Sequence, residues 1–321
     1  MRFAGSIGIA AMLAGLPLAG TAQEYPAQMV RIVVPTSGGG SSDTVGRVIA
    51  ERLRERLGQP VIVDNRPGAG QMIGAEHVAK AAPDGYTLGF VGGTYTTSIA
   101  LRAKLPFDPV KDLTGVARAG EGAFMLAVHP SLPAKSAREL IAIARTRPGQ
   151  MNFGSAGTGS ITHLVTELFV GMAKINVTHV PYKSGPPAAT DLVGGHIEMM
   201  IGSLPLLMHH ANSGRIRALG VTSAKRFSLA PNLLTVAETG VPGYEAMQWW
   251  GMLAPAKTSA GIIARLNREI NAILKTDDVT ARLAGEGAIP SQLSAEAFSA
   301  SVRTEIANWR KIVSDLKLPL Q

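Results

Sequence analysis

QPVIVDNRPGAGQMIG, residues 59–74, contains a strand, a glycine-rich turn and the start of a helix. Residues 61–63 are a β-branched run, and the helical segment after the turn ends at PDGY, residues 83–86. A strand, a turn and a helix in this order are typical of a doubly wound α/β sheet. The sequence therefore predicts an α/β fold with mainly parallel strands and flanking helices.

Apolar patterns of the same kind continue on both sides of this segment. Val30–Val34 is a β-branched run, and apolar residues recur at helical spacing through residues 45–57. Residues 75–82 are expected as a helix and residues 87–91 as a third strand, which gives the order β-α-β-α-β. The pattern then repeats, with strands expected at residues 124–128, 151–153, 177–180, 197–201, 218–221 and 248–253, and helices at residues 137–146, 161–172, 188–193, 206–213 and within 262–316.

Composition limits the class of protein. The 321 residues are 46% hydrophobic and 17% charged, which is enough for a large core and two domains. There is no cysteine, so disulfides and a lipid anchor on cysteine are excluded. The net charge of +8 comes from scattered basic residues, which favours encounter with anionic solutes and does not indicate a nucleic-acid partner.

The amino terminus has the composition of an export signal. Arg2 supplies a positive charge, residues 7–18 are apolar, and Gly20 and Ala22 are small residues at the positions that a signal peptidase reads. The apolar run is too short to cross a hydrocarbon layer of about 30 Å. We therefore expect a signal peptide over residues 1–22, cleaved near Ala22, and a soluble protein of the bacterial periplasm.

Two glycine- and serine-rich loops each lie between a strand and a helix. The first is PTSGGGSSD, residues 35–43, and the second is GSAGTGS, residues 154–160, with His163 in the first turn of the next helix. Backbone N–H groups at a helix N-terminus suit an anion, and glycine allows close approach. The pair predicts a site for a ligand with one or two carboxylates; the alternative is that the loops only turn the chain.

Patterns for catalysis and metal binding are missing from the sequence. It has no G-x-S-x-G elbow, and its seven histidines lack metal-ligand spacing, so we expect neither an enzyme nor a cofactor or metal. Asp43 is interpreted as a stabiliser of its helix dipole and not as a catalytic carboxylate. A dinucleotide-dependent α/β enzyme is the alternative, because Gly68, Gly70 and Gly74 follow a strand, although their spacing is one residue longer than the dinucleotide fingerprint.

The same segments resemble one protein family. DNRPGAG at residues 64–70, GA at 74–75 and PDGYTL at 83–88 are similar to the signature of the substrate-binding proteins of tripartite tricarboxylate transporters, also called Bug or tricarboxylate-binding receptors. The two glycine-serine loops and VPYKS at residues 180–184 are similar to further motifs of that family. The resemblance covers nearly all of the chain after the signal.

The resemblance implies a two-domain, type II-like periplasmic-binding-protein fold with a cleft between the domains. Residues 23–120 and 225–321 would form domain 1 and residues 121–224 domain 2, with hinge crossings near residues 119–123 and 221–227. It also implies a monomeric receptor that closes over a small carboxylate. The receptor would deliver this ligand to a membrane permease with a large and a small subunit, and a sensor kinase is a further candidate partner.

Candidate ligand-binding residues come from the loops and the resemblance together. Thr36 stands where relatives carry an aromatic residue, and Gly202 and Ser203 stand where many carry Asp-Asn, so we expect a roomier cleft that accepts a di- or tricarboxylate or an aromatic acid. The candidates are Thr36, Ser37, Gly38, Gly39, Gly40, Asp43, Gly93, Thr94, Ser155, Ala156, Thr158, Gly159, Ser160, His163, Tyr182 and Ser203.

Overall fold

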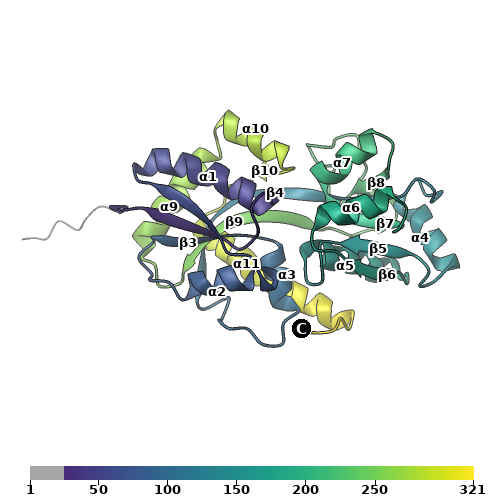
Figure 1. Ribbon diagram of the computed structural model, residues 1–321, viewed down its shortest axis with the longest axis horizontal. Coiled ribbons are helices and arrows are strands. Elements are labelled where there is room, and N and C mark those ends of the chain that lie inside the picture. Colours follow the sequence, from purple (N-terminus) through teal and green to yellow (C-terminus); the bar gives the residue numbers. More distant parts are fainter. Residues whose placement is uncertain (1–24) are drawn as a thin grey trace, which may run out of the picture.

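The structure, a computed structural model, consists of two α/β units side by side (Figure 1). It describes residues 25–321, so the expected signal peptide over residues 1–22 lies outside the described residues. Between residues 25 and 321, no helix has the length and apolar character needed to cross a membrane.

The first unit is built on three parallel strands in the order β2-β1-β3. Strand β9 extends this sheet, antiparallel to β3. Gly74 allows a helix to pack closely, since an ideal Cβ there would lie 2.6 Å from the Pro35 side chain. The elements are β1 (Val30–Val34), α1 (Ser41–Leu57), β2 (Val61–Asn65), η1 (Ala69–Gln71), α2 (Met72–Ala79), β3 (Thr87–Gly92), α3 (Thr94–Ala100), β9 (Met247–Pro255), α9 (Ala260–Ile273), α10 (Asp277–Gly285), β10 (Ile289–Pro290) and α11 (Ala295–Asp315).

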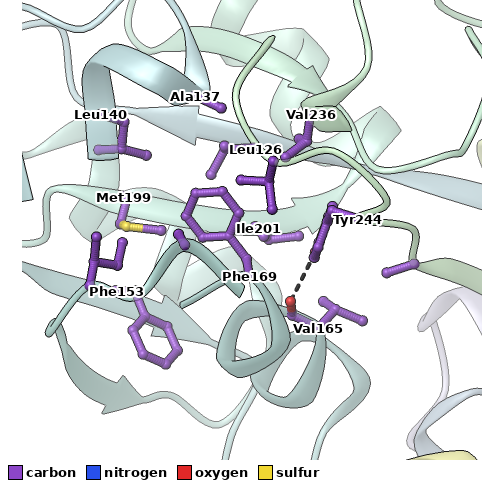
Figure 2. Packing of buried hydrophobic residues seen from close by; sticks show 14 of the residues in the cluster. Leu126, Ala137, Leu140, Phe153, Val165, Phe169, Met199, Ile201, Val236 and Tyr244 are labelled. Carbon is purple, nitrogen blue, oxygen red and sulfur yellow. Dashed lines mark hydrogen bonds between the residues drawn. The ribbon is translucent and has the colours of Figure 1, made fainter. Parts of the chain in front are cut away.

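The second unit has its own parallel strands, with β5 between β6 and β7. Its core surrounds Phe169, whose ring meets the ring of Tyr244 edge-on with centroids 5.8 Å apart (Figure 2). The Tyr244 hydroxyl donates to the Val165 carbonyl oxygen at 2.8 Å, so this buried hydroxyl is satisfied. The elements are α4 (Ala137–Thr146), β5 (Asn152–Ser155), α5 (Ile161–Ala173), β6 (Thr178–Pro181), α6 (Gly185–Val193), β7 (Met199–Ser203), α7 (Leu204–Asn212), β8 (Arg217–Val221) and α8 (Val236–Thr239).

Two long strands join the units. Strand β4 (Leu113–Val128) pairs with β9 up to Ala123 and with β7 from Phe124 onwards. The strands of both units therefore form one continuous sheet in the order β2-β1-β3-β9-β4-β7-β5-β6. Strands β8 and β10 also pair with β4. The first part of β4 was not predicted, because its glycine-rich sequence lacks a β-branched run.

The return crossing lies later than the predicted residues 221–227. Phe227 packs in a second-unit cluster with Leu207, and Tyr244 packs against Phe169. The chain re-enters the first unit at Met247, where β9 begins to pair with β4. The candidate residues Gly93 and Thr94 lie at a helix start, because α3 begins at Thr94 and Thr96 donates its hydroxyl hydrogen to the Gly93 carbonyl.

Candidate functional site

The predicted loops lie where parallel strands of both units end. β1 and β3 lead into the loops before α1 and α3, and β5 and β7 lead into the N-termini of α5 and α7. Ligands of open α/β sheets bind at the carboxyl ends of the strands. Figure 1 shows α1 and α3 at the boundary with the second unit, where α5, α6 and α7 lie.

The N-termini of α1 and α5 converge on the turn Gly92-Gly93. An ideal Cβ on Gly92 would lie 3.2 Å from Ser42 Oγ in the first turn of α1. An ideal Cβ on Gly93 would lie 3.3 Å from the side chain of Ile161, the first residue of α5. The two helix starts, one from each unit, therefore flank the same turn.

Helix α1 begins without a side-chain cap. Its N-cap is Gly40, whereas Ser136, Ser160, Thr235, Ser259 and Ser294 cap α4, α5, α8, α9 and α11 through their hydroxyls. The loop from Ser37 to Gly40 is exposed. First-turn N–H groups that lack an intramolecular acceptor can donate to an anion. The N–H groups in the first turn of α1 are therefore available to an anion, as the glycine-serine loop predicts.

Asp43 points into its own loop. Its side chain is 5% exposed and accepts hydrogen bonds from Gly39 N–H at 2.9 Å, Arg47 Nε at 3.0 Å and Asn65 Nδ2 at 2.9 Å. Burial acts to raise the pKa of this carboxyl, but the bonds from Arg47, Gly39 and Asn65 outweigh it, and the pKa lies below its usual value. Asp43 therefore holds the shape of the loop, with its oxygens engaged by the protein itself.

We expect Asp43→Asn to lower the free energy of unfolding at pH 7 by about 1–3 kcal/mol, because it weakens three hydrogen bonds to a buried carboxylate. A lowered native pKa means that this stability is present above the unfolded pKa and is lost as pH falls through the native pKa. The difference from wild type should therefore shrink at pH 3. Urea denaturation at both pH values measures it, with exposed Asp277→Asn in the first turn of α10 as control. An equal difference at both pH values would contradict the charge-based explanation.

Most hydroxyl groups in and beside the second loop form hydrogen bonds within the protein. Ser160 Oγ accepts from His163 N–H at 3.2 Å, and Thr162 Oγ1 accepts from Ala156 N–H at 2.9 Å. Ser155 is fully buried, and its Oγ lies 2.7 Å from His179 Nε2. Thr158 is the exposed side chain of this loop. The hydroxyls of Ser155 and Ser160 therefore shape the loop, and the Thr158 side chain is exposed to solvent.

Contacts between the units join α3 to the second loop. Thr94 Oγ1 accepts from Ile161 N–H at 3.3 Å, and Thr97 donates its hydroxyl hydrogen to the Gly159 carbonyl at 2.9 Å. Gly93 donates its N–H to Gln248 Oε1 at 3.2 Å. Thr97 and Gln248 could not be identified from the sequence, because one threonine among several, or a single glutamine in an apolar segment, carries no recognisable pattern.

Tyr182 and Ser203 lie at the ends of β6 and β7. The Tyr182 hydroxyl donates to Asp191 Oδ2 at 2.6 Å, so the ring is tied to α6. Burial, this hydrogen bond and the carboxylate charge raise the pKa of Tyr182 to about 12. Ser203 is exposed at the start of α7 and makes no side-chain cap bond there. Both residues therefore lie on the second-unit side of the boundary between the two units.

The glycine turn that suggested a dinucleotide site is filled by the protein. An ideal Cβ on Gly70 would lie 2.3 Å from Ser98 Oγ of α3, and Arg102 donates to the Ala69 carbonyl at 2.9 Å. Gly70 therefore allows close approach of α3, and Gly74 allows close approach of α2 to Pro35. Over residues 25–321, no cluster of three or more His, Cys, Asp or Glu side chains could hold a metal ion.

Two cavities of measurable volume lie away from the predicted loops. One of about 480 Å³ lies beside α9 and α11 and includes Asn267 and Arg303 in its wall. Another cavity of about 270 Å³ is lined by Trp249 on β9 and Trp309 on α11. The predicted site residues instead lie at strand ends and in the first turns of helices. Some of these side chains are exposed and others are buried.

Comparison with known proteins identifies the fold and the family. The fold is that of two-domain periplasmic solute-binding proteins. Residues 45–318 match the family described as "Tripartite tricarboxylate transporter family receptor", and the chain belongs to this family. Protein BugT of Bordetella pertussis is 36% identical over 316 residues, which cover 98% of this chain and 97% of BugT.

Two solved structures of similar proteins contain carboxylates. R. palustris Rpa4515 with adipate has 37% sequence identity and a TM-score of 0.84, covering 93% of this chain and all of that one. MatC from Rhodopseudomonas palustris with bound malate has 32% identity and a TM-score of 0.79, covering 90% of this chain and all of that one. Both ligands are dicarboxylates.

Proposed function

We propose that this protein is a periplasmic receptor that binds a small dicarboxylate between its two units and is not an enzyme. The observation that carries the proposal is the uncapped N-terminus of α1 in an exposed glycine loop, opposite the N-terminus of α5. One carboxylate would accept N–H hydrogen bonds from the first turn of α1, and the other would lie at Thr158 and Ser203. The adipate and malate complexes of similar proteins support this ligand class.

The remaining candidate residues have supporting roles in this proposal. Thr36 to Gly39, Gly93, Thr94, Ala156 and Gly159 would shape the walls with their backbone, while Asp43, Ser155, Ser160 and His163 hold the loops. Ser155 and His179 form a hydrogen-bonded pair, but Ser155 is fully buried, so a substrate could not reach it as a nucleophile. This burial supports a receptor over a hydrolase.

Two further parts of the proposal rest on the family. The bound receptor would deliver its ligand to a permease with one large and one small membrane subunit, and a sensor kinase would be a second partner. Export through the predicted signal peptide would place the receptor in the periplasm. The family description names a transporter receptor, which supports the permease as the main partner.

Calorimetry on residues 23–321 tests the ligand class with adipate, malate, citrate, terephthalate and NADH. We expect a dicarboxylate to bind, and at about 100 times its dissociation constant to stabilise the fold by about 2.7 kcal/mol in a melting experiment. If terephthalate binds more tightly than adipate, the roomier pocket expected from Thr36 and Ser203 is correct. Binding of NADH alone would overturn the receptor in favour of a dinucleotide enzyme.

A further inference from the structure

Two stacked histidine rings lie beneath the second loop. His163 on α5 and His179 on β6 have ring centroids 4.0 Å apart with an interplanar angle of 20°. Phe153 on β5 stacks on His179 at 4.8 Å. The His163 side chain is 7% exposed and His179 is half-buried. The rings are thus packed in a partly desolvated stack directly below residues 155–159.

Each ring holds one end of the loop. His179 Nε2 lies 2.7 Å from Ser155 Oγ, and His163 Nδ1 accepts the Gly159 N–H at 3.3 Å. The carbonyl of Gly159 accepts the hydroxyl hydrogen of Thr97 from the first unit at 2.9 Å. Gly159 is therefore hydrogen-bonded through its N–H to His163 and through its carbonyl oxygen to Thr97 of the first unit.

The bond from Gly159 specifies the protonation of His163. A backbone N–H can only donate, so Nδ1 carries no proton and the ring proton lies on Nε2, which faces Glu167 Oε1 at 3.5 Å. A ring protonated on both nitrogens would lose the acceptor for Gly159. Protonation of His163 must therefore release this end of the loop.

The surroundings disfavour charge on His179. Burial and the neighbouring His163 lower the pKa of His179 to about 4. Glu167 on α5 is the charged side chain that faces the stack, while Phe153 and Ser155 on β5 and Thr97 on α3 are uncharged. A positive charge on either ring opposes a charge on the other at 4.0 Å.

We propose that His163 and His179 are positioning residues that hold residues 155–159 in the ligand-binding conformation, and that His163 does so only while its ring is neutral. The inference rests on the proposed function, in which this loop binds a carboxylate. It requires ligand affinity to fall on acidification. A histidine in direct contact with the carboxylate would have the opposite effect, because its protonation would strengthen binding of an anion.

The test uses variants that keep an acceptor but cannot gain a proton. The amide oxygen of His163→Asn can replace Nδ1 as acceptor, and the amide group of His179→Gln can replace Nε2 as donor or acceptor to the Ser155 hydroxyl. His163→Leu and His179→Leu can do neither. Dissociation constants for adipate are measured by calorimetry from pH 8 to pH 5. Exposed His209→Gln on α7 is the matched control. Melting temperatures identify any variant that does not fold.

At pH 8 we expect the Asn and Gln variants to bind within about threefold of wild type, and the Leu variants about tenfold more weakly, as for one lost hydrogen bond. From pH 8 to pH 5 wild type and His209→Gln should weaken relative to His163→Asn. This ratio cancels protonation of adipate itself. A constant ratio, or a relative gain of wild-type affinity at low pH, would overturn the inference.

A second measurement needs no ligand. The Gly159 amide signal in NMR spectra should shift between pH 8 and pH 5 in wild type and stay constant in His163→Asn. A constant signal in wild type would overturn the positioning role even if adipate binds. If none of adipate, malate, citrate and terephthalate binds at pH 8 but the amide signal titrates, the proposed function is wrong and the histidine contact is correct.

Discussion

Gly40→Asp should weaken adipate binding at least about 100-fold while leaving the protein folded. The carboxylate of an aspartate at this N-cap would accept hydrogen bonds from the first-turn N–H groups of α1, the groups that we assign to the ligand. Two like charges about 4 Å apart repel by about 4 kcal/mol at an effective dielectric constant of about 20, which exceeds the 2.7 kcal/mol that corresponds to about 100-fold. Calorimetry at neutral pH measures the change.

The backbone at Gly40 tolerates a side chain. Its φ of −79° and ψ of 161° are extended, and an ideal Cβ would lie 3.7 Å from the Ser37 carbonyl oxygen, an ordinary contact. An aspartate cap is a few tenths of a kcal/mol better than glycine, so stability should not fall. Gly40→Ala is the control and should bind adipate within about threefold of wild type. If Gly40→Asp binds adipate with wild-type affinity, the ligand does not bind at the N-terminus of α1.

Phe169→Ala should lower the free energy of unfolding by about 3–5 kcal/mol. Phe169 is fully buried in the second unit, among Leu126, Ile201 and Tyr244 (Figure 2). Removing its ring deletes the edge-on contact with Tyr244 and leaves a cavity that the surrounding strands and α5 cannot close. Urea denaturation measures the change in stability.

Met172→Ala is the matched control for Phe169→Ala. Met172 lies on the same helix and is 40% exposed, so its truncation should cost less than about 1 kcal/mol. The two variants share the same helix and differ in burial, which separates cavity formation from helix propensity. A loss below about 1 kcal/mol in Phe169→Ala would mean that the second-unit core is not packed around this ring.

Most helices and strands could be predicted from local patterns. Helix α4 begins and ends where its apolar spacing indicated, and β1 coincides with a β-branched run. Helix α3 could not be predicted, because its threonine-rich sequence favours a strand. Its residues from Tyr95 to Ala100 are buried, and packing against α11 outweighs their weak helix propensity.

The candidate site was predicted in part. The glycine-serine loops lie at the strand ends as their position between strand and helix required. The roles of their side chains depend on partners distant in the chain, such as Asn65 for Asp43 and Thr97 for Gly159. Pairings of this kind leave no local pattern, so the sequence could not separate residues that hold the loops from residues that remain exposed.

The order of strands and helices, the glycine turns and the family follow from the amino-acid sequence, because they depend on propensities and spacings of residues that are near neighbours in the chain. The path that the chain takes between the two units depends on the tertiary structure. Strand β4 pairs with β9 of the first unit and with β7 and β8 of the second. The stack of His163 on His179 forms because β5 aligns β6 beside α5. These features arise from contacts between distant segments, whose free energy no single segment contains.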